Sequence, residues 1–476
     1  MAEPWATLGI DLHLEPTGPG LRRGLTGALR EAVRSGRLAP GTRLPSSRAL
    51  AADLGIARNT VADAYADLVA EGWLTARQGS GTRVATGAPA TPARQPGRTQ
   101  PAPPSGTAAH AQQRARSRPS YDLRPGNPDL ASFPRAEWLR AARRALAAAP
   151  YHALDYGDPR GRPELRAALA GYLSRARGVR ADPERIVVCA GFAHALRLLG
   201  TVLRARGART VAVESYGLDV HRDLLTDAGL ATTPLPFDAR GTDPDGLDDA
   251  DAVLLTPAHQ FPMGVPLHRD RRAAVVDRAR RTGALILEDD YDGEFRYDRQ
   301  PVGALQGLDP DRVAYLGTAS KSLAPGLRLA WAVLPPDLAG EVAAAKGGVD
   351  TCGALDQLTL AEFLTSGAYD RHVRASRLRY RRRRDALVAA VAARAPQARV
   401  TGIAAGLHVL LRLPPGSEQS VVQAANWRGL ALHGLARYRN PTARVEPLDA
   451  LVVGYGTPPD HAWSGALDAL CAALPG

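Results

Sequence analysis

Lys321 has the most reactive side chain in its segment, Gly317-Thr318-Ala319-Ser320-Lys321. The 476-residue chain has only one other lysine, Lys346, whereas arginine, alanine and glycine are abundant, as is typical of a GC-rich genome. A lysine that persists against this bias points to a requirement for a primary amine, which can bond covalently to a carbonyl compound. Lys346 precedes two glycines, and we expect it to be an ordinary helix-end cation.

A carboxylate and a phenol occur together in Glu288-Asp289-Asp290-Tyr291. Pyridoxal 5'-phosphate requires an amine for a Schiff base, a carboxylate that keeps its pyridine nitrogen protonated, and a hydroxyl for its ring oxygen. We predict these roles for Lys321, Asp289 and Tyr291. Asp290 stays open as an alternative to its neighbour Asp289.

The phosphate of such a cofactor requires backbone N–H groups at a helix start, together with hydroxyl and cationic side chains. The sequence offers candidates for each, namely Gly191, Phe192, Ala193, Thr318, Ser320 and Arg328. We expect the nearby Asp292 and Glu294 to form loop hydrogen bonds instead.

Short apolar strands separated by helices would position these groups. The expected strands are Ile186–Val188, Thr210–Val213, Ala252–Leu255, Ala284–Leu287 and Val313–Leu316. Continuous apolar strands that alternate with helices indicate a mostly parallel sheet covered on both faces. Ligands of such sheets bind beyond the carboxyl ends of the strands, which is where the polar motifs fall.

The N-terminal part follows the order of a winged helix-turn-helix. Helices are expected from about Gly20 to Ser35, from Pro45 to Leu54 with Ser46 as N-cap, and from about Arg58 to Glu71. The apolar residues expected to face inward include Leu21, Leu25, Leu29, Val61, Tyr65, Leu68 and Val69. Two strands, 72–77 and 82–85, joined by a glycine-rich turn at 78–81, would form the wing.

This segment closely resembles the DNA-binding domain of the GntR family, through Leu44-Pro45-Ser46-Ser47-Arg48, Arg58-Asn59-Thr60-Val61 and Gly79-Ser80-Gly81-Thr82. A recognition helix places its N-terminal turn in the major groove of double-stranded DNA. The expected DNA-binding residues are Arg58, Asn59 and Thr60 in that turn, Arg43, Ser46 and Arg48 around the preceding helix, and Gly79, Ser80, Gly81 and Arg83 in the wing.

The region from Tyr156 to Pro336 resembles fold-type I aminotransferases, and specifically those fused to GntR-type heads in the MocR (GabR-like) family. The strongest marks are Thr256 to Gly264, Glu288 to Tyr297 and Gly317 to Arg328. The resemblance implies a multidomain chain with a small α/β winged helix-turn-helix and a large α/β aminotransferase-like domain. It also implies a head-to-tail homodimer, and therefore paired half-sites in the operator.

Three parts are expected along the chain. Residues 1–85 form the DNA-binding domain, 86–120 a linker rich in proline, alanine and arginine, and 121–476 the domain that binds pyridoxal phosphate. The linker has too few large apolar residues to offset its ordering entropy, so we expect a tether.

The sequence departs from the family pattern at several cofactor positions. Leu218 stands where relatives stack an aromatic ring on the cofactor, so that Phe192, His194 or Tyr216 would have to substitute. Val452 occupies the position of the arginine that binds a substrate carboxylate in true aminotransferases. Arg437 is a candidate to bind an effector instead, with a structural role as the alternative.

The favoured function is that of a DNA-binding transcription regulator. Its large domain would sense pyridoxal phosphate itself, or an amino compound that forms an external aldimine with it. The alternative is an active aminotransferase with a vestigial DNA-binding head, although Val452 argues against full transaminase turnover. In a third interpretation the chain is a structural DNA-binding dimer that has lost the cofactor.

Composition restricts the remaining classes. A net charge of +12 is compatible with a polyanionic partner, and 45% apolar residues suffice for a large core. Cys189, Cys352 and Cys471 are far apart in the sequence, so neither a disulfide framework nor a metal site is expected. No leader and no apolar run of ~20 residues is evident, which predicts a cytoplasmic protein without a membrane partner.

Overall fold

A computed structural model describes residues 20–77, 81–86, 119–247, 249–297 and 302–475. Residue contacts divide the chain into two compact units, Met1–Ser117 and Arg118–Gly476. The expected linker, 86–120, lies almost entirely outside the described residues, as do Gly79 and Ser80 of the expected wing tip. None of the described helices combines the length and the apolar character that crossing a bilayer requires.

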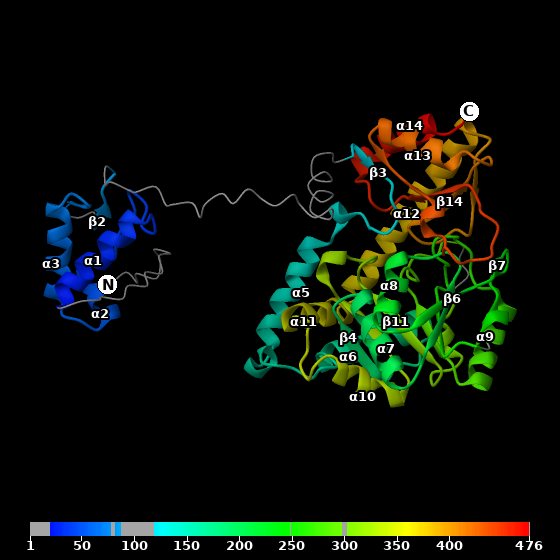
Figure 1. Cartoon of the computed structure of the whole chain (residues 1–476), viewed down its shortest axis with the longest axis horizontal. Coiled ribbons are helices and arrows are strands. Elements are labelled where there is room, and N and C mark those ends of the chain that lie inside the picture. The colour runs from blue at the N-terminus through cyan, green and yellow to red at the C-terminus, as the bar shows by residue number, and fades with distance from the viewer. Residues whose placement is uncertain (1–19, 78–80, 87–118, 248, 298–301, 476) are drawn as a thin grey trace. The chain divides into compact units, whose positions relative to one another are not determined.

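The N-terminal unit has three helices followed by an antiparallel ribbon (Figure 1). They are α1 (Leu21–Arg34), α2 (Ser47–Leu54), α3 (Arg58–Ala70), β1 (Leu74–Arg77) and β2 (Gly81–Val84). Ser46 is the N-cap of α2, because its hydroxyl accepts a hydrogen bond from the amide of Ala49 at 3.1 Å. Gly55 ends this helix in the left-handed conformation, with φ +64°, which favours glycine.

Most of the expected apolar face of this unit is buried, including Leu25, Leu29, Val61 and Leu68. Two expectations were wrong, since Leu21 is 57% exposed and Val69 37% exposed. Leu21 is the first residue of α1, and Val69 lies at the margin of the face that Leu68 presents. Both residues fit the helical spacing of the apolar residues, but no neighbouring element among the described residues covers their side chains.

A seven-stranded sheet forms the centre of the large unit, in the order β4-β12-β11-β10-β9-β5-β6. Its strands are β4 (Ile186–Cys189), β5 (Thr210–Glu214), β6 (Ala231–Leu235), β9 (Ala252–Leu255), β10 (Leu285–Asp289), β11 (Val313–Thr318) and β12 (Ala330–Val333). Only β12 runs antiparallel to its neighbours β11 and β4. The prediction of a mostly parallel sheet was therefore correct.

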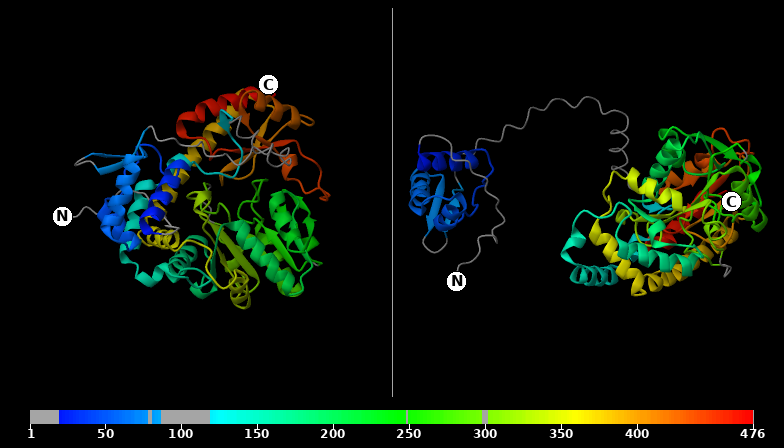
Figure 2. Two further views of the ribbon diagram at one scale, coloured as in Figure 1. Left: turned by 60° about the vertical axis from the view of Figure 1, so that its left-hand side comes forward. Right: turned by 90° about the horizontal axis from the view of Figure 1, so that it is seen from below.

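Helices cover both faces of this sheet, as Figures 1 and 2 show. One face packs mainly against α7 (Phe192–Ala205), α8 (Asp219–Asp227) and α10 (Pro336–Ala345). The other packs mainly against α6 (Pro163–Arg177), α9 (Arg269–Thr282) and α11 (Ala354–Thr365), with α5 (Arg135–Ala148) against α11. The buried strands thus have apolar partners on both sides, which explains their continuous apolar sequences.

A four-stranded antiparallel sheet, β13-β14-β17-β16, forms a second core near the C-terminus. Its strands are β13 (Arg399–Thr401), β14 (His408–Arg412), β16 (His433–Gly434) and β17 (Ala450–Gly454). It packs with α12 (Ala368–Arg394), α13 (Glu418–Trp427) and α14 (Trp463–Ala473). The start of the unit joins this region, because β3 (Tyr121–Asp122) pairs with β15 (Leu430–Ala431).

The remaining short elements are connections. They are β7 (Phe237–Asp238), β8 (Gly241–Thr242), and the 3-10 turns η2 (Leu130–Ser132), η3 (Tyr151–Leu154), η4 (Pro183–Arg185), η5 (Pro244–Gly246), η6 (Leu305–Gly307), η7 (Pro325–Leu327), η8 (Leu435–Tyr438) and η9 (Asp460–Ala462).

Candidate functional site

A cavity of about 420 Å³ opens beyond the carboxyl ends of the central strands. All the residues predicted to hold the cofactor line it except Gly191, and they are Lys321, Asp289, Tyr291, Phe192, Ala193, Thr318, Ser320 and Arg328. Because β10 and β11 are parallel neighbours, Asp289 and the segment after Thr318 meet at one edge of the sheet. The structure therefore brings the separate sequence motifs together.

Lys321 follows β11 and directs its amine toward the loop before α5. Its Nζ donates to the carbonyl oxygen of Gly126 at 2.5 Å. Burial lowers the pKa of Lys321, while the carboxylates of Asp289 and Asp292 oppose this shift. A lowered pKa makes the neutral, nucleophilic form of the amine more accessible at neutral pH.

Asp289 and Asp290 lie side by side in the sequence but have different surroundings. Asp290 forms a buried ion pair with Arg177 at 2.6 Å and accepts a hydrogen bond from Tyr315 at 2.7 Å. Asp289 lines the cavity, is 5% exposed, and its Oδ1 has no hydrogen-bond partner among the described residues. Burial raises the pKa of Asp289 well above its usual range, and the nearby Lys321 opposes that shift.

Tyr291 is oriented by a residue that the sequence analysis missed. Its hydroxyl lies 3.1 Å from both the carbonyl oxygen and the Nδ1 atom of His259. That imidazole nitrogen also lies 2.8 Å from Oδ2 of Asp292. Asp292 therefore serves the loop around Tyr291, and Glu294 accepts a hydrogen bond from Tyr369 at 3.1 Å. The signal for His259 was its place in the motif from Thr256 to Gly264.

The turn between β4 and α7 has the features of a phosphate site. Gly191 is the N-cap of α7 with φ +90°, and an added Cβ would lie 2.4 Å from Nη2 of Arg328. The same guanidinium donates to the carbonyl oxygen of Ala190 at 2.6 Å. The Thr318 hydroxyl donates to Oγ of Ser320 at 2.9 Å on the same side of the cavity.

The aromatic side of the cavity differs in part from the expectation. Phe192, Leu218 and Tyr216 line it, whereas His194 accepts a hydrogen bond from the amide of Ala190 through Nδ1. His221 of α8 also lines the cavity, and its ring centroid lies 4.6 Å from that of Phe192. Burial lowers the pKa of His221 to about 4, so this ring is neutral at physiological pH. The sequence analysis did not single it out.

The wall near the C-terminus contains Arg437, His433 and Tyr438. Val452 is fully buried in an apolar cluster with Leu435 and Tyr438, and it contributes no charge to the cavity. Burial lowers the pKa of His433 to about 4, so Arg437 is the cationic group on this wall.

These residues fit pyridoxal phosphate. The unpartnered Oδ1 of Asp289 is a ready acceptor for a pyridinium N–H. A Cβ on Gly191 would clash with Arg328, so a glycine is needed for this guanidinium to lie against the start of α7, where both suit a phosphate. Lys321 supplies the amine in the same cavity.

The candidate DNA interface lies on the N-terminal unit. Arg58 and Asn59 begin α3 and are exposed, while Thr60 is half-buried. Arg83 of the wing donates to the carbonyl oxygen of Gly41 at 3.1 Å.

The exposed Arg43 and Arg48 lie in the segment before α2 and on α2 itself. An added Cβ on Gly81 would lie 3.2 Å from Nε of Arg43, so this guanidinium lies close to the start of β2, beside the turn of the wing. The head thus carries arginines at the start of α3, on α2, in the segment before α2 and in β2.

Comparisons with known proteins match both units. Residues 21–84 match the model of bacterial regulatory proteins of the gntR family, and residues 121–441 match aminotransferase class I and II. The pyridoxine biosynthesis transcriptional regulator PdxR of Corynebacterium glutamicum is 34% identical, over 94% of this chain and 95% of its own. The probable rhizopine catabolism regulatory protein MocR of Rhizobium meliloti is 34% identical, over 91% and 90%.

Solved structures resemble the large unit. An archaeal alanine:glyoxylate aminotransferase is 25% identical with a TM-score of 0.68, over 77% of this chain and 93% of its own. LysN of Thermus thermophilus, complexed with N-(5'-phosphopyridoxyl)-L-leucine, is 25% identical with a TM-score of 0.65, over 74% and 91%. These similarities confirm the predicted fold class and the predicted cofactor.

Proposed function

The chain belongs to the MocR family of transcription regulators, in which a GntR-type head is joined to an aminotransferase-like domain, and on this basis we propose how its two units are coupled. The protein is a DNA-binding regulator that depends on pyridoxal phosphate. We infer that occupation of the Lys321 cavity changes the affinity of the head for its operator. A ligand can do this only through different affinities for two states of the protein.

The observation that carries this proposal is the amine of Lys321 in one cavity with the unpartnered carboxylate oxygen of Asp289. Bound pyridoxal phosphate supplies an aldehyde carbon that bonds amines and a ring that withdraws electrons. Lys321 would provide the covalent anchor, Asp289 would hold a proton on the ring nitrogen, and Tyr291 would donate to the ring oxygen.

The phosphate end would rest on the start of α7. The amides of Phe192 and Ala193 have no partner within the helix and can be presented to an anion. The amide of Gly191, which was expected to join them, donates instead to the carbonyl oxygen of Cys189 at 2.8 Å. Thr318, Ser320 and Arg328 would complete the phosphate site with hydroxyls and a guanidinium.

The effector is pyridoxal phosphate itself or a primary amine that competes with Lys321 for it. The similarity to a regulator named for pyridoxine biosynthesis favours the first. Arg437 supports the second, because it has no hydrogen bond or ion pair within the described residues and could receive an anionic group of the amine. Removal of Arg437 should then weaken the response to the amine while leaving that to the cofactor unchanged.

Transaminase turnover is the less favoured function. PdxR and MocR, which match more than nine tenths of the chain, are named as regulators, and Val452 leaves its position without a carboxylate-binding cation.

We also propose a head-to-tail homodimer that reads paired half-sites, with residues 86–120 as the tether between residues 1–85 and 121–476. Large side chains before α6 support a protein partner, since Tyr151 is 91% exposed, Tyr156 90% and Leu154 58%. Sedimentation at several protein concentrations tests this assembly.

The test of the coupling measures binding to DNA from the promoter of the gene itself by fluorescence anisotropy, with and without pyridoxal phosphate. The wild-type protein should change its affinity by about 5- to 150-fold, the usual range for coupled sites. Lys321→Ala should bind the DNA but lose the response. Loading is verified separately by visible absorbance and by borohydride reduction with peptide mapping.

Because coupling is reciprocal, saturating DNA should shift the affinity for pyridoxal phosphate by the same factor. A wild-type protein that is loaded at Lys321 but binds DNA equally in both states would contradict the proposal.

A further inference from the structure

The second lysine, Lys346, stands at a helix end as expected from the sequence, but it is not an ordinary surface cation. It caps the C-terminus of α10, but its side chain has 0% exposure. Its Nζ donates to the carbonyl oxygen of Val188 at 2.9 Å and pairs with Oδ1 of Asp350, also at 2.9 Å. Val188 lies in β4, three residues before Gly191 of the phosphate turn.

Strand β4 is the edge of the central sheet, so one side of it has no strand partner. On the side away from β12, the amide of Val188 donates to the carbonyl oxygen of Arg160 at 2.8 Å. Lys346 satisfies the carbonyl of the same residue. Because this edge is buried, an unpaired carbonyl there would be costly, and the ammonium substitutes for a neighbouring strand.

Asp350 connects this ammonium to two further segments. Its Oδ1 accepts from the amide of Cys352 at 3.1 Å, and its Oδ2 accepts from Nε2 of Gln357 at 2.5 Å. Oε1 of Gln357 in turn accepts from the amide of Arg162 at 2.8 Å. The buried group therefore joins the end of β4, the segment between α10 and α11, and the segment before α6.

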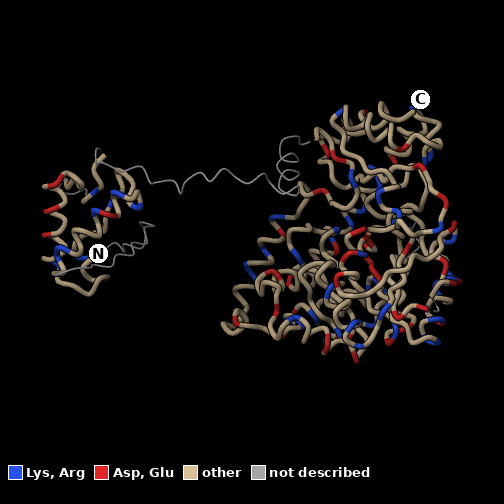
Figure 3. The backbone as a smooth tube through the Cα atoms, in the orientation of Figure 1, with Lys and Arg blue, Asp and Glu red and all other residues tan. Residues whose placement is uncertain are grey.

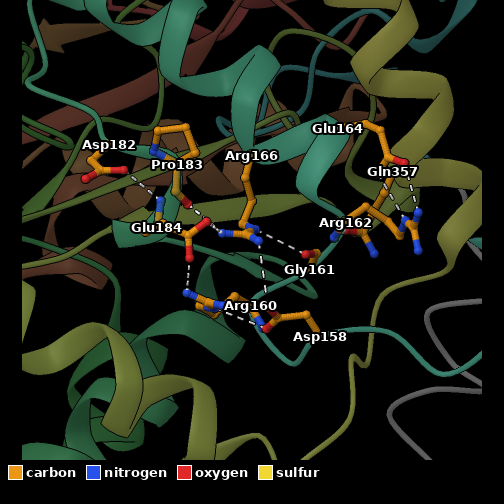
Figure 4. A network of polar contacts seen from close by, with 10 residues as sticks. All are labelled: Asp158, Arg160, Gly161, Arg162, Glu164, Arg166, Asp182, Pro183, Glu184 and Gln357. Atoms are coloured by element: carbon orange, nitrogen blue, oxygen red, sulfur yellow. Dashed lines mark hydrogen bonds and ion pairs between the residues drawn. The ribbon is translucent and has the colours of Figure 1, made fainter.

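The segment before α6 is itself rigidly held, as Figure 4 shows. Arg160 pairs with Asp158 at 2.7 Å, and Arg166 pairs with Glu184 at 2.9 Å. An added Cβ on Gly161 would lie 2.6 Å from Val188 and 2.8 Å from Oε1 of Gln357, so the backbone approaches β4 directly. The segment before α6 therefore packs closely against β4 at the edge of the sheet.

On the cavity side, the same turn is held by Arg328, which donates to the carbonyl of Ala190. We propose that Lys346 is a positioning residue for the cofactor phosphate, because it fixes the end of β4 from which the amides at the start of α7 project. This inference rests on the proposed phosphate site. Lys346 contacts none of the residues proposed to hold the cofactor ring, namely Lys321, Asp289 and Tyr291. A substitution of Lys346 should therefore weaken binding of the phosphate and leave binding of the ring unchanged.

The residue type at position 346 supports the positioning role, because this chain has only two lysines and many arginines. An ammonium has three donors, of which two are used here by Val188 and Asp350. A guanidinium has five donors in a planar fork and would leave several unpaired in a fully buried site.

The test compares binding of pyridoxal phosphate with binding of pyridoxal, which lacks the phosphate, by absorbance titration of the full-length protein. Lys346→Met retains the volume but cannot donate. We expect its Kd for pyridoxal phosphate to rise roughly 10-fold or more, because the amides that face the phosphate are no longer held in place, an effect of about the size of one charge-assisted hydrogen bond. The Kd for pyridoxal should change less than about 2-fold, within the scatter of a neutral contact.

Lys346→Met leaves Asp350 buried without its cation, so the double variant Lys346→Met/Asp350→Asn is measured beside it. Arg271→Met is the matched control, because Arg271 is also buried and pairs with Asp238 at 2.6 Å but does not line the cavity. It should lose stability while keeping the wild-type ratio of the two Kd values.

Equal weakening for both probes in the Lys346 variants, or no weakening for either, would overturn the inference. If instead the wild-type protein showed no preference for the phosphorylated probe, the proposed phosphate site itself would fail.

Discussion

At the scale of single residues, the site depends on which way adjacent side chains project. Asp289 is the last residue of β10, and Asp290 follows it with its amide still donating to the carbonyl oxygen of Leu316 at 3.0 Å, so the two side chains point to opposite faces as in a strand. One carboxylate therefore lines the cavity, and the other pairs with Arg177 inside the protein. The difference in surroundings predicts different consequences for the same substitution at the two positions.

Asp289→Asn should leave the stability of the large unit nearly unchanged, because Oδ1 of this buried carboxyl group has no partner that the substitution would leave unpaired. It should, however, slow the exchange of an added amine with the Lys321-bound cofactor, since the ring nitrogen loses its anionic partner. Stopped-flow absorbance measures this rate. A normal rate would contradict the role given to Asp289.

Asp290→Asn should instead destabilise the large unit by about 3–5 kcal/mol, because Arg177 would be left buried without its partner. Chemical denaturation followed by tryptophan fluorescence measures the loss. If Asp290→Asn rather than Asp289→Asn impaired the amine exchange in protein that is still folded, the two assignments would have to be reversed.

At the scale of elements, the head combines helix α3, which can enter the major groove of DNA, with the wing formed by β1 and β2, which can contact the DNA backbone beside that groove. Helix α3 packs against α1 in the apolar core of the head. Two largely exposed ion pairs also join these segments, Arg22 with Asp67 at 2.5 Å and Arg30 with Glu71 at 2.7 Å. Helix α2 depends on the Ser46 cap. The exposed Arg48 and Arg58 lie on these two helices.

Arg58→Ala should weaken binding to the operator by about 1–3 kcal/mol, the value of a base contact, and should reduce the preference over scrambled DNA. Arg83→Ala should weaken binding to both DNAs about equally, because a wing arginine contacts backbone phosphate. Anisotropy titrations with both DNAs distinguish the cases. If Arg58→Ala and Arg83→Ala lost the same preference for the operator, the assignment of α3 as the recognition helix would be wrong.

Ser46→Ala should lower the stability of the head by about 1 kcal/mol, because the amide of Ala49 loses its acceptor. Ser35→Ala is the control, since its hydroxyl makes only a 3.4 Å contact with the carbonyl of Ala32. Thermal unfolding by circular dichroism compares the two. Similar melting temperatures would show that the cap contributes little.

At the scale of the whole molecule, the charges outside the site are distributed over both units, with basic and acidic residues interspersed (Figure 3). Glu288 and Glu294 are buried inside the large unit, and Glu214 is half-buried and lines the cavity. Burial raises the pKa of Glu214, Glu288 and Glu294 to about 7 in each case. Stability should therefore depend on pH near neutrality.

Glu214 gives the clearest test, because it accepts hydrogen bonds from Thr256 at 2.5 Å and Thr242 at 2.9 Å. Its pKa is about 7 in the folded protein against an ordinary 4.5, so the folded state keeps a proton that the unfolded state releases. Its contribution to stability is complete below the ordinary value and is lost as pH rises toward 7, by roughly 3 kcal/mol at most.

Glu214→Gln removes this titration and preserves the shape of the side chain. The melting temperature of the wild-type protein should fall relative to this variant between pH 5 and pH 8. Parallel curves for the two proteins would show that Glu214 does not carry the predicted shift.

The sequence alone determined the family, the order of the elements and the reactive groups. Lys321, the acid-rich motif and the strand ends follow from residue type and local spacing, and the helical period predicted most of the head core. The structure brought these residues together as expected, because neighbouring parallel strands end at one edge of the sheet.

Only the tertiary structure decided the parts that depend on contacts between distant segments. It separated Asp289 from Asp290, placed His259 against Tyr291 and His221 against Phe192, and buried Lys346. Local sequence cannot specify such contacts, because burial and hydrogen-bond partners depend on how the strands and helices pack.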